Sequence, residues 1–249
     1  MRALITGASS GIGRDIAIKL SEIGYDLIVI ARRGDKLGEL KEIVKTEVEA
    51  ITLDISSPEA CFSLYEAVKD KNIDIVINNA GFGLLGRFDE TDIRRELQMQ
   101  DTNIKALHIL TKLFLKDFMK KDRGYILNVA SSAAFLPGPL MSTYYATKAY
   151  VLRLTEAIYE ELKQQKSNVY VGILCPGPVH TEFGSVANVS FSVKGLTSKY
   201  VANYAVEKMF RKQLVIIPGR IMKVCRLLTK ILPDKLLAKA AYNIQKKKK

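Results

Sequence analysis

The chain has 249 residues, of which 48% are hydrophobic and 26% charged, close to the average of globular proteins. This excludes a disulfide-stapled mini-protein, a disordered polyelectrolyte and a membrane-embedded bundle, and the length suits one large α/β domain. The longest uncharged stretch, 124–147, is interrupted by serines and prolines and predicts no spanning helix. An apolar strand directly after Met1, in place of a signal peptide, and three cysteines without metal-ligand spacing predict a reduced, cytoplasmic protein without a metal site.

The formal net charge of +12 is concentrated at the C-terminal end. Residues 214–249 hold ten basic residues against one acid, Asp234, a net of +9 that leaves +3 for the first 213 residues. The body of the chain has no basic stripe interleaved with aromatic residues. The sequence therefore predicts no nucleic-acid partner.

Short apolar runs alternate with longer segments of helical periodicity, which predicts repeated βα units and a parallel sheet. The expected fold is a single doubly wound, Rossmann-type α/β domain over residues 1–219, with 220–249 as a basic C-terminal extension rather than an independent domain. The seven predicted strands are 2–6, 26–31, 49–53, 73–78, 124–130, 169–174 and 213–217. The predicted helices are 11–23, 35–46, 58–69, 91–121, 142–165 and 197–212.

The first predicted strand runs directly into a glycine-rich turn that opens the first helix. Glycines let a backbone approach phosphates, and a helix N-terminus offers unpaired N–H groups. The spacing Gly-x3-Gly-x-Gly is a variant of the dinucleotide fingerprint, and a tight turn without a ligand is the alternative. The residues expected at the cofactor are Thr6, Gly7, Ser9, Ser10, Gly11, Ile12 and Gly13.

The second strand is followed by Arg32 and Arg33, where an NAD-selective site would carry a carboxylate. Guanidinium groups favour a ribose 2′-phosphate through charge-assisted hydrogen bonds, so the expected cofactor is NADP(H). Arg32 is the preferred candidate for this contact. For Arg33, a solvated loop charge is an equal alternative.

Two further strands end in residues suited to a cofactor. An acceptor at the end of the third strand can meet an adenine amino group, and small residues after the fourth let the backbone pass close to a ligand. Each segment alone could be turn chemistry, but both lie at the carboxyl ends of parallel strands, where such sheets bind ligands. The residues are Asp54 and Ile55, then Asn79, Ala80 and Gly81.

Tyr144 and Lys148 are four residues apart on a predicted helix and therefore share one face. A nearby ammonium lowers a phenol pKa towards neutrality and so makes tyrosine a useful acid and base. Tyr145 is expected to face elsewhere. A buried tyrosine beside a surface lysine is the common alternative for an isolated pair of this kind.

Taken jointly, these segments resemble the short-chain dehydrogenase/reductase family over about residues 1–220. The resemblance rests on residues 6–13, Asp54, 78–81, Asn103, Ser132, Tyr144 with Lys148, and 176–181. It implies that Tyr144 is the general acid/base, that Lys148 binds the nicotinamide ribose and lowers the tyrosine pKa, and that Ser132 orients the substrate carbonyl. It also implies that Asn103 holds a water in a proton relay.

The resemblance further implies that Pro176, Gly177, Val179 and Thr181 line the nicotinamide. Ser131 is the less favoured active serine, because the family usually employs the second of such a pair. The segment between Ser132 and Tyr144 is one residue shorter than in many members.

The expected reaction is NADPH-dependent reduction of a small to medium lipophilic ketone or aldehyde. The residues expected to rim the pocket are apolar and bring no lysine or arginine, which favours a lipophilic substrate over a sugar phosphate. They are Phe82, Leu84, Leu85, Phe135, Leu136, Leu140, Met141, Phe183 and Phe191. The alternatives are a non-catalytic NADP(H)-binding sensor or scaffold, and a nucleotide-sugar epimerase, which usually has a longer chain.

Two expectations concern association. The predicted helices 91–121 and 142–165 carry apolar residues over much of their circumference, and in the resembling family such helices form the main subunit contact, so a homodimer or homotetramer is expected. The residues are Leu107, Leu110, Phe114, Phe118, Leu152 and Ile158. The amphipathic basic segment after Gly219 is predicted to be a lid or subunit contact, a peripheral membrane helix or a contact for an acidic partner.

Overall fold

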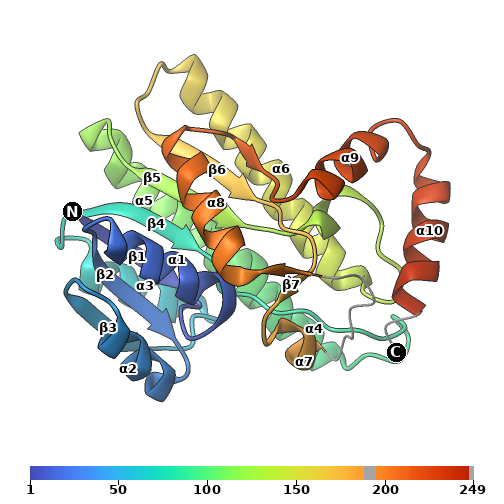
Figure 1. The fold of residues 1–249 in the computed structure, drawn as a ribbon, viewed down its shortest axis with the longest axis horizontal. Helices are drawn as coiled ribbons and strands as arrows, with labels where there is room; N and C mark the ends of the chain where they lie inside the picture. The colour runs from blue at the N-terminus through green and yellow to red at the C-terminus, as the bar shows by residue number, and fades with distance from the viewer. Residues whose placement is uncertain (188–194, 247–249) are drawn as a thin grey trace.

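A computed structural model describes residues 1–187 and 195–246. Its centre is a parallel sheet of seven strands in the order β3-β2-β1-β4-β5-β6-β9 (Figure 1). The strands are β1 Arg2–Thr6, β2 Asp26–Ala31, β3 Val48–Thr52, β4 Ile73–Asn78, β5 Tyr125–Val129, β6 Tyr170–Leu174 and β9 Val215–Ile216. The prediction of a seven-stranded, doubly wound sheet is confirmed.

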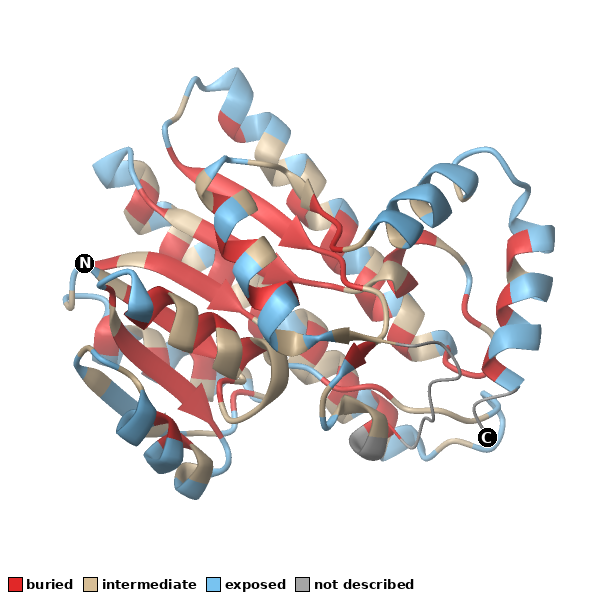
Figure 2. Ribbon diagram, viewed as in Figure 1, coloured by how far each residue is buried: buried red, intermediate tan, exposed pale blue. Residues whose placement is uncertain are grey.

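Helices cover both faces of the sheet (Figure 1). One face packs against α1 Gly11–Glu22, α2 Gly34–Ile43 and α8 Ser198–Phe210, and the other against α3 Pro58–Val68, α5 Leu107–Lys121 and α6 Ser142–Gln164. Figure 2 shows the central strands buried throughout and the helices exposed on their outer sides. This two-sided burial is why the strand sequences are apolar at nearly every position.

The segment predicted as one helix over 91–121 is three consecutive helical pieces. The α-helix α4 spans Ile93–Gln100, a π-helical turn spans Asp101–Ala106, and α5 follows. A π-helical turn holds one extra residue and is often found at functional sites. Here it carries the buried Asn103.

Several short elements were not predicted. A two-stranded sheet pairs β7 Val179–His180 with β8 Leu196–Thr197, the helix α7 spans Phe183–Ala187, and a 3-10 turn covers Ser132–Phe135.

The C-terminal extension forms α9 Arg220–Leu228 and α10 Asp234–Lys246. In Figure 1 both helices lie at the edge of the molecule away from β2 and β3.

Candidate active site

The glycine-rich turn is clamped between β1 and β4. The Thr6 hydroxyl accepts hydrogen bonds from the backbone N–H groups of Asn79 and Ala80 at 3.0 and 3.1 Å. The Asn79 side-chain amide donates to the carbonyls of Thr6 and Gly7, both at 3.0 Å. A Cβ at Gly13 would lie 2.3 Å from that amide nitrogen, so the turn closes only around glycine.

The helix that follows the turn begins without a side-chain cap. Ser10 is its N-cap residue, and its hydroxyl makes no capping hydrogen bond. Gly7 and Gly11 have positive φ angles of 68° and 56°, which are strained for other residues. The first N–H groups of α1 are therefore left for a ligand, as a pyrophosphate site requires.

Arg33 lies across this turn and is held there by side-chain contacts, with 44% of its side chain exposed. Its guanidinium donates to the hydroxyls of Ser9 and Ser10, both at 3.1 Å, and forms a 2.7 Å ion pair with Glu182. Hydrogen bonding to Arg33 lowers the pKa of Glu182 below its ordinary value. Arg32 has an exposed side chain whose nearest carboxylate is Asp54, at 4.0 Å. Both arginines line the same pocket.

Both serines of the pair line the pocket, but Ser131 is the one whose side chain lowers the pKa of Tyr144 against the larger raising effect of burial, whereas the sequence favoured Ser132. Ser131 also caps the 3-10 turn by accepting from the Ala133 N–H at 3.1 Å. The backbone N–H of Ser132 donates to the Pro176 carbonyl at 2.8 Å.

Lys148 is buried beside Tyr144. Its ammonium donates to the Val129 carbonyl at 3.1 Å and lies 5.8 Å from the centroid of the Tyr144 ring. Burial lowers the pKa of Lys148 to about 8. Burial also raises the pKa of Tyr144 above its ordinary value, contrary to the expected lowering by Lys148, because loss of solvent outweighs the other influences on the phenol.

Asn103 is fully buried on the π-helical turn. Its carbonyl oxygen accepts from the Phe82 N–H at 3.0 Å, and its amide donates to the Phe82 carbonyl at 2.9 Å and to the Thr147 hydroxyl at 3.1 Å. A Cβ at Gly81 would lie 2.7 Å from the Asn103 carbonyl oxygen and 3.3 Å from the Lys148 ammonium. Both polar atoms of the Asn103 side chain therefore hydrogen-bond to protein groups. The water of the predicted proton relay would have to bind the Asn103 backbone instead.

One pocket of about 460 Å³ connects these groups. Of the residues predicted as catalytic or cofactor-binding, all line this pocket except Thr6, Gly13 and Asn103, which pack behind its wall. The arginines and the glycine-rich turn contribute to this wall together with Tyr144 and Lys148. Asp54 accepts from the Ser56 N–H at 3.0 Å, and Ile55 is buried beside it.

The expectation that Tyr145 faces elsewhere was wrong. Its ring lies 6.1 Å from that of Tyr144, between centroids, and it lines the pocket. Gln245, at the end of α10, donates its amide to the Tyr145 hydroxyl, while its carbonyl oxygen is buried without a hydrogen-bond partner among residues 1–187 and 195–246. The sequence gives no signal for this contact, because the two residues are 100 positions apart.

The apolar end of the pocket is smaller than the predicted rim. Phe82, Met141 and Phe183 line it and pack together with Tyr144. Phe135 and Leu136 belong to a separate core cluster behind β5 and α6. The remaining predicted rim residues Leu84, Leu85 and Leu140 are not among those that line the pocket, and Phe191 lies outside the described residues.

Comparison with known proteins decides the family. Residues 1–190 match the family model described as short chain dehydrogenase. The chain belongs to the short chain dehydrogenase family. As a member of this family, it is an oxidoreductase.

Relatives agree with this assignment. An uncharacterized oxidoreductase of Staphylococcus epidermidis is 34% identical over 182 residues, which cover 72% of this chain and 78% of the relative. A probable NADP-dependent dehydrogenase of Haemophilus influenzae is 34% identical over 190 residues, 74% of each chain.

Solved structures of short chain dehydrogenases share the fold. One from Sphingobium yanoikuyae, in complex with NADPH, is 28% identical with a TM-score of 0.82 and covers 93% of this chain and 96% of its own. The bulky-bulky ketone specific alcohol dehydrogenase from Comamonas testosteroni is 26% identical with a TM-score of 0.77, covering 93% and 94%.

Two further features of this short chain dehydrogenase bear on its site. Within residues 1–187 and 195–246, no group of three or more histidine, cysteine or acidic residues is placed to hold a metal ion. In the same part of the chain, no helix is long and apolar enough to cross a membrane.

Proposed function

We propose that this protein reduces the carbonyl group of a lipophilic ketone or aldehyde, with NADPH as the hydride donor. The observation that carries the proposal is the shared pocket. Tyr144, Ser131 and Lys148 line the same continuous pocket as the glycine-rich turn and two arginines. A cofactor held by the turn and a substrate held by Tyr144 would therefore meet.

The residues present fit NADP(H). The uncapped start of α1 and the positive-φ glycines suit a pyrophosphate, and the guanidinium groups of Arg32 and Arg33 suit a 2′-phosphate. Among the similar proteins, the Sphingobium yanoikuyae enzyme was solved with NADPH, and the Haemophilus influenzae relative is described as NADP-dependent. NADPH, rather than NADH, is the cofactor that this charge distribution favours.

In the proposed reaction, bound NADPH supplies a hydride to the carbonyl carbon. The Tyr144 hydroxyl donates its proton to the carbonyl oxygen as negative charge develops there. The Ser131 hydroxyl, whose side chain lowers the pKa of the Tyr144 phenol, gives the same oxygen a second donor. The buried Lys148 ammonium, anchored on the Val129 carbonyl, faces the phenol and stabilises the phenolate left after proton transfer.

The substrate class follows from the pocket lining. Its apolar end consists of Phe82, Met141 and Phe183, whereas the pocket-lining cations are Lys148 and the two arginines assigned to the cofactor. A charged substrate would lack a counterion at the apolar end, so a lipophilic carbonyl compound is favoured. The similar Comamonas testosteroni enzyme is specific for bulky-bulky ketones, which supports this choice.

The function is tested by following NADPH oxidation against ketones and aldehydes of graded chain length, with NADH in parallel. We expect turnover with apolar carbonyl compounds and a preference for NADPH. Tight NADPH binding without turnover of any carbonyl compound would instead favour a sensor or scaffold. Turnover of nucleotide sugars with no net NADPH consumption would favour an epimerase.

We also propose that the protein acts in the cytoplasm as a homodimer or as a tetramer built from dimers. The apolar residues on which the sequence argument relied do not support this, because Leu107, Leu110, Phe114, Phe118 and Leu152 are buried in the core of one chain. What supports a dimer is the exposed surface of α4, where Ile93 and Leu97 lie open to solvent.

A further inference from the structure

The helix α9 presents its apolar side to solvent. Ile221 is 71% exposed and Leu227 60%, and Val224 and Leu228 are also exposed. None of the residues of α9 is buried, and Figure 2 shows the helix largely exposed. A helix that packs on a globular core normally does the reverse.

The inward side of α9 explains how this orientation is fixed. Arg226 places its guanidinium 4.3 Å from the centroid of the Phe135 ring and forms a 3.7 Å ion pair with Glu156. Its side chain is only 16% exposed. Met222 packs against the core cluster of Phe135 and lies next to Gly177. A cation and a methionine thus attach the helix to the body and leave the aliphatic stripe outside.

The exposed stripe continues beyond α9. Ile231, Leu232 and Leu236 are exposed in the turn and in the first residues of α10. At 3.6 residues per turn, Ile221, Val224 and Leu228 fall on one side of α9. We call the apolar residues Ile221, Val224, Leu227, Leu228, Ile231, Leu232 and Leu236 the outer stripe. Such a contiguous exposed apolar surface marks a contact site.

Charge decides what the outer stripe contacts. Arg220, Lys223 and Lys230 are exposed on α9 and directly after it, and Lys235 and Lys239 follow on α10. The only acid of residues 214–249 is Asp234. A second copy of the chain would bring these cations against their own equivalents, whereas an anionic lipid surface satisfies both the cations and the aliphatic side chains.

We propose that α9 and the start of α10 dock on an anionic membrane surface, with the outer stripe in the boundary between headgroups and acyl chains. The helices lie flat on the bilayer, since no helix of the described chain is long and apolar enough to span it. The basic residues beside the stripe meet lipid phosphates. This docking is independent of the proposed reaction.

Cosedimentation with vesicles tests the proposal on the full-length protein. The vesicles are phosphatidylcholine alone and phosphatidylcholine mixed with phosphatidylglycerol. We expect binding to the mixed vesicles, weaker binding in high salt and little binding to phosphatidylcholine alone. Absence of binding to the mixed vesicles would overturn the proposal.

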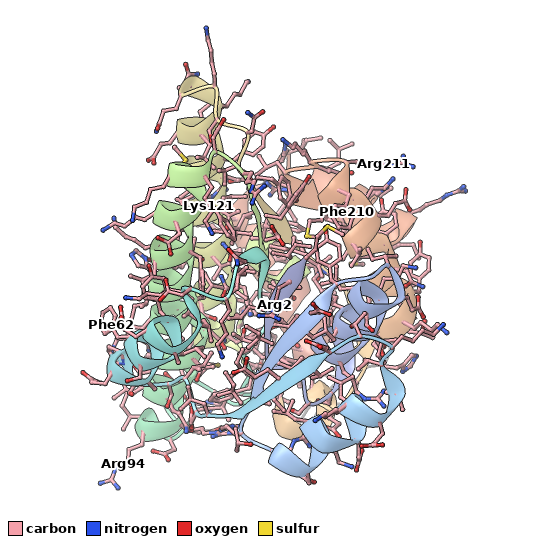
Figure 3. The ribbon with its side chains drawn as sticks, turned by 90° about the vertical axis from the view of Figure 1, so that its left-hand side faces the viewer. Arg2, Phe62, Arg94, Lys121, Phe210 and Arg211 are labelled. Carbon is pink, nitrogen blue, oxygen red and sulfur yellow. The ribbon has the colours of Figure 1, made fainter. Side chains whose placement is uncertain are left out.

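Paired variants locate the contact. Val224→Asp with Leu228→Asp should lose vesicle binding, whereas Phe62→Asp, at an exposed apolar residue of α3 on the outer side of the molecule (Figure 3), should keep it. Lys223→Gln with Lys230→Gln should weaken binding about thirtyfold, because each lysine near an anionic surface contributes roughly a fivefold factor. The control variant, Lys120→Gln with Lys121→Gln at the end of α5, also loses two positive charges and should leave vesicle binding unchanged.

Sedimentation velocity of the same variants completes the test. The Lys223→Gln, Lys230→Gln protein alters exposed side chains, of which Lys223 places its ammonium 5.5 Å from the centroid of the Tyr204 ring, and it should keep the wild-type sedimentation coefficient and circular dichroism. Equal losses of vesicle binding in the α9 variants and in their controls would contradict docking through α9. A smaller assembly in the Val224→Asp, Leu228→Asp variant, with vesicle binding retained, would assign the outer stripe to a second copy.

Discussion

The assignment of the active serine is the site prediction that the structure changes most, from Ser132 to Ser131. The sequence favoured Ser132, but Ser131 is the serine whose side chain acts on the Tyr144 phenol by lowering its pKa, and the Ser132 backbone N–H donates to the Pro176 carbonyl. Ser131→Ala should therefore lower kcat by about 10² to 10³, the usual loss for one donor to a developing oxyanion. Ser132→Ala should lower it less than about tenfold. Steady-state kinetics of the two variants measures this, and a larger loss in Ser132→Ala would restore the sequence assignment.

Lys148 should leave a signature in the pH dependence of stability. Its folded-state pKa of about 8 is below the ordinary value of 10.5, so between these pH values the unfolded chain binds more protons than the folded one. Stability relative to Lys148→Met should consequently rise from pH 8 to pH 10, by up to about 1.4 kcal/mol per pH unit. Below pH 8 the lysine is charged in both states and its full burial penalty is present.

Denaturant unfolding at pH 8, 9 and 10 checks the Lys148 effect. The control is Lys120→Met on the exposed end of α5, which should follow the wild type at every pH. A free-energy difference between wild type and Lys148→Met that stays constant over this range would refute the assigned burial of a titrating lysine.

The contact between the glycine-rich turn and β4 can be tested through one glycine. A Cβ at Gly13 would lie 2.3 Å from the Asn79 amide and 2.5 Å from the Gly7 carbonyl, so Gly13→Ala must displace the turn. We expect it to cost about 1 to 3 kcal/mol of stability and to weaken NADPH binding. Gly38→Ala on α2, where a Cβ meets nothing within 4 Å, should be neutral or stabilising by up to about 1 kcal/mol. Calorimetry and thermal unfolding of both variants give the comparison, and similar behaviour would count against a clamped turn.

Among the secondary-structure elements, the sequence predicted the strands best. The bounds of β1, β2 and β4 agree with the predicted ranges, because strands buried on both faces are apolar throughout and end abruptly at polar or small residues. The π-helical turn around Asn103 could not be predicted, since its apolar spacing continues that of the flanking helices. Within the site, the sequence predicted the groups that are close along the chain, namely the glycine-rich turn and the pair Tyr144 and Lys148 on one helix face, and both groups line the pocket.

Contacts between distant elements were beyond sequence reasoning. Glu182 reaches Arg33 across 149 positions, and Gln245 reaches Tyr145 only because α10 folds back over the pocket. Neither pairing follows a local spacing. The choice between Ser131 and Ser132 likewise depends on where the strand ends relative to the following 3-10 turn.

For the molecule as a whole, the proposed dimer makes a simple prediction. Sedimentation velocity at micromolar concentration should show twice the 27.8 kDa mass of the chain, or a multiple of it. Because the proposed contact is on α4 and not on α9, the Val224→Asp, Leu228→Asp variant should sediment as the wild type does. A monomeric wild-type protein would refute the dimer.

The central claim is that Tyr144 protonates a carbonyl compound reduced by NADPH. The most direct measurement compares wild type and Tyr144→Phe in NADPH oxidation with the best carbonyl substrate, together with NADPH affinity by calorimetry. Loss of the hydroxyl should lower turnover by about 10² to 10⁴ and leave NADPH affinity nearly unchanged, because the phenol acts on the substrate. A Tyr144→Phe protein that keeps more than about a tenth of the wild-type rate would contradict the account.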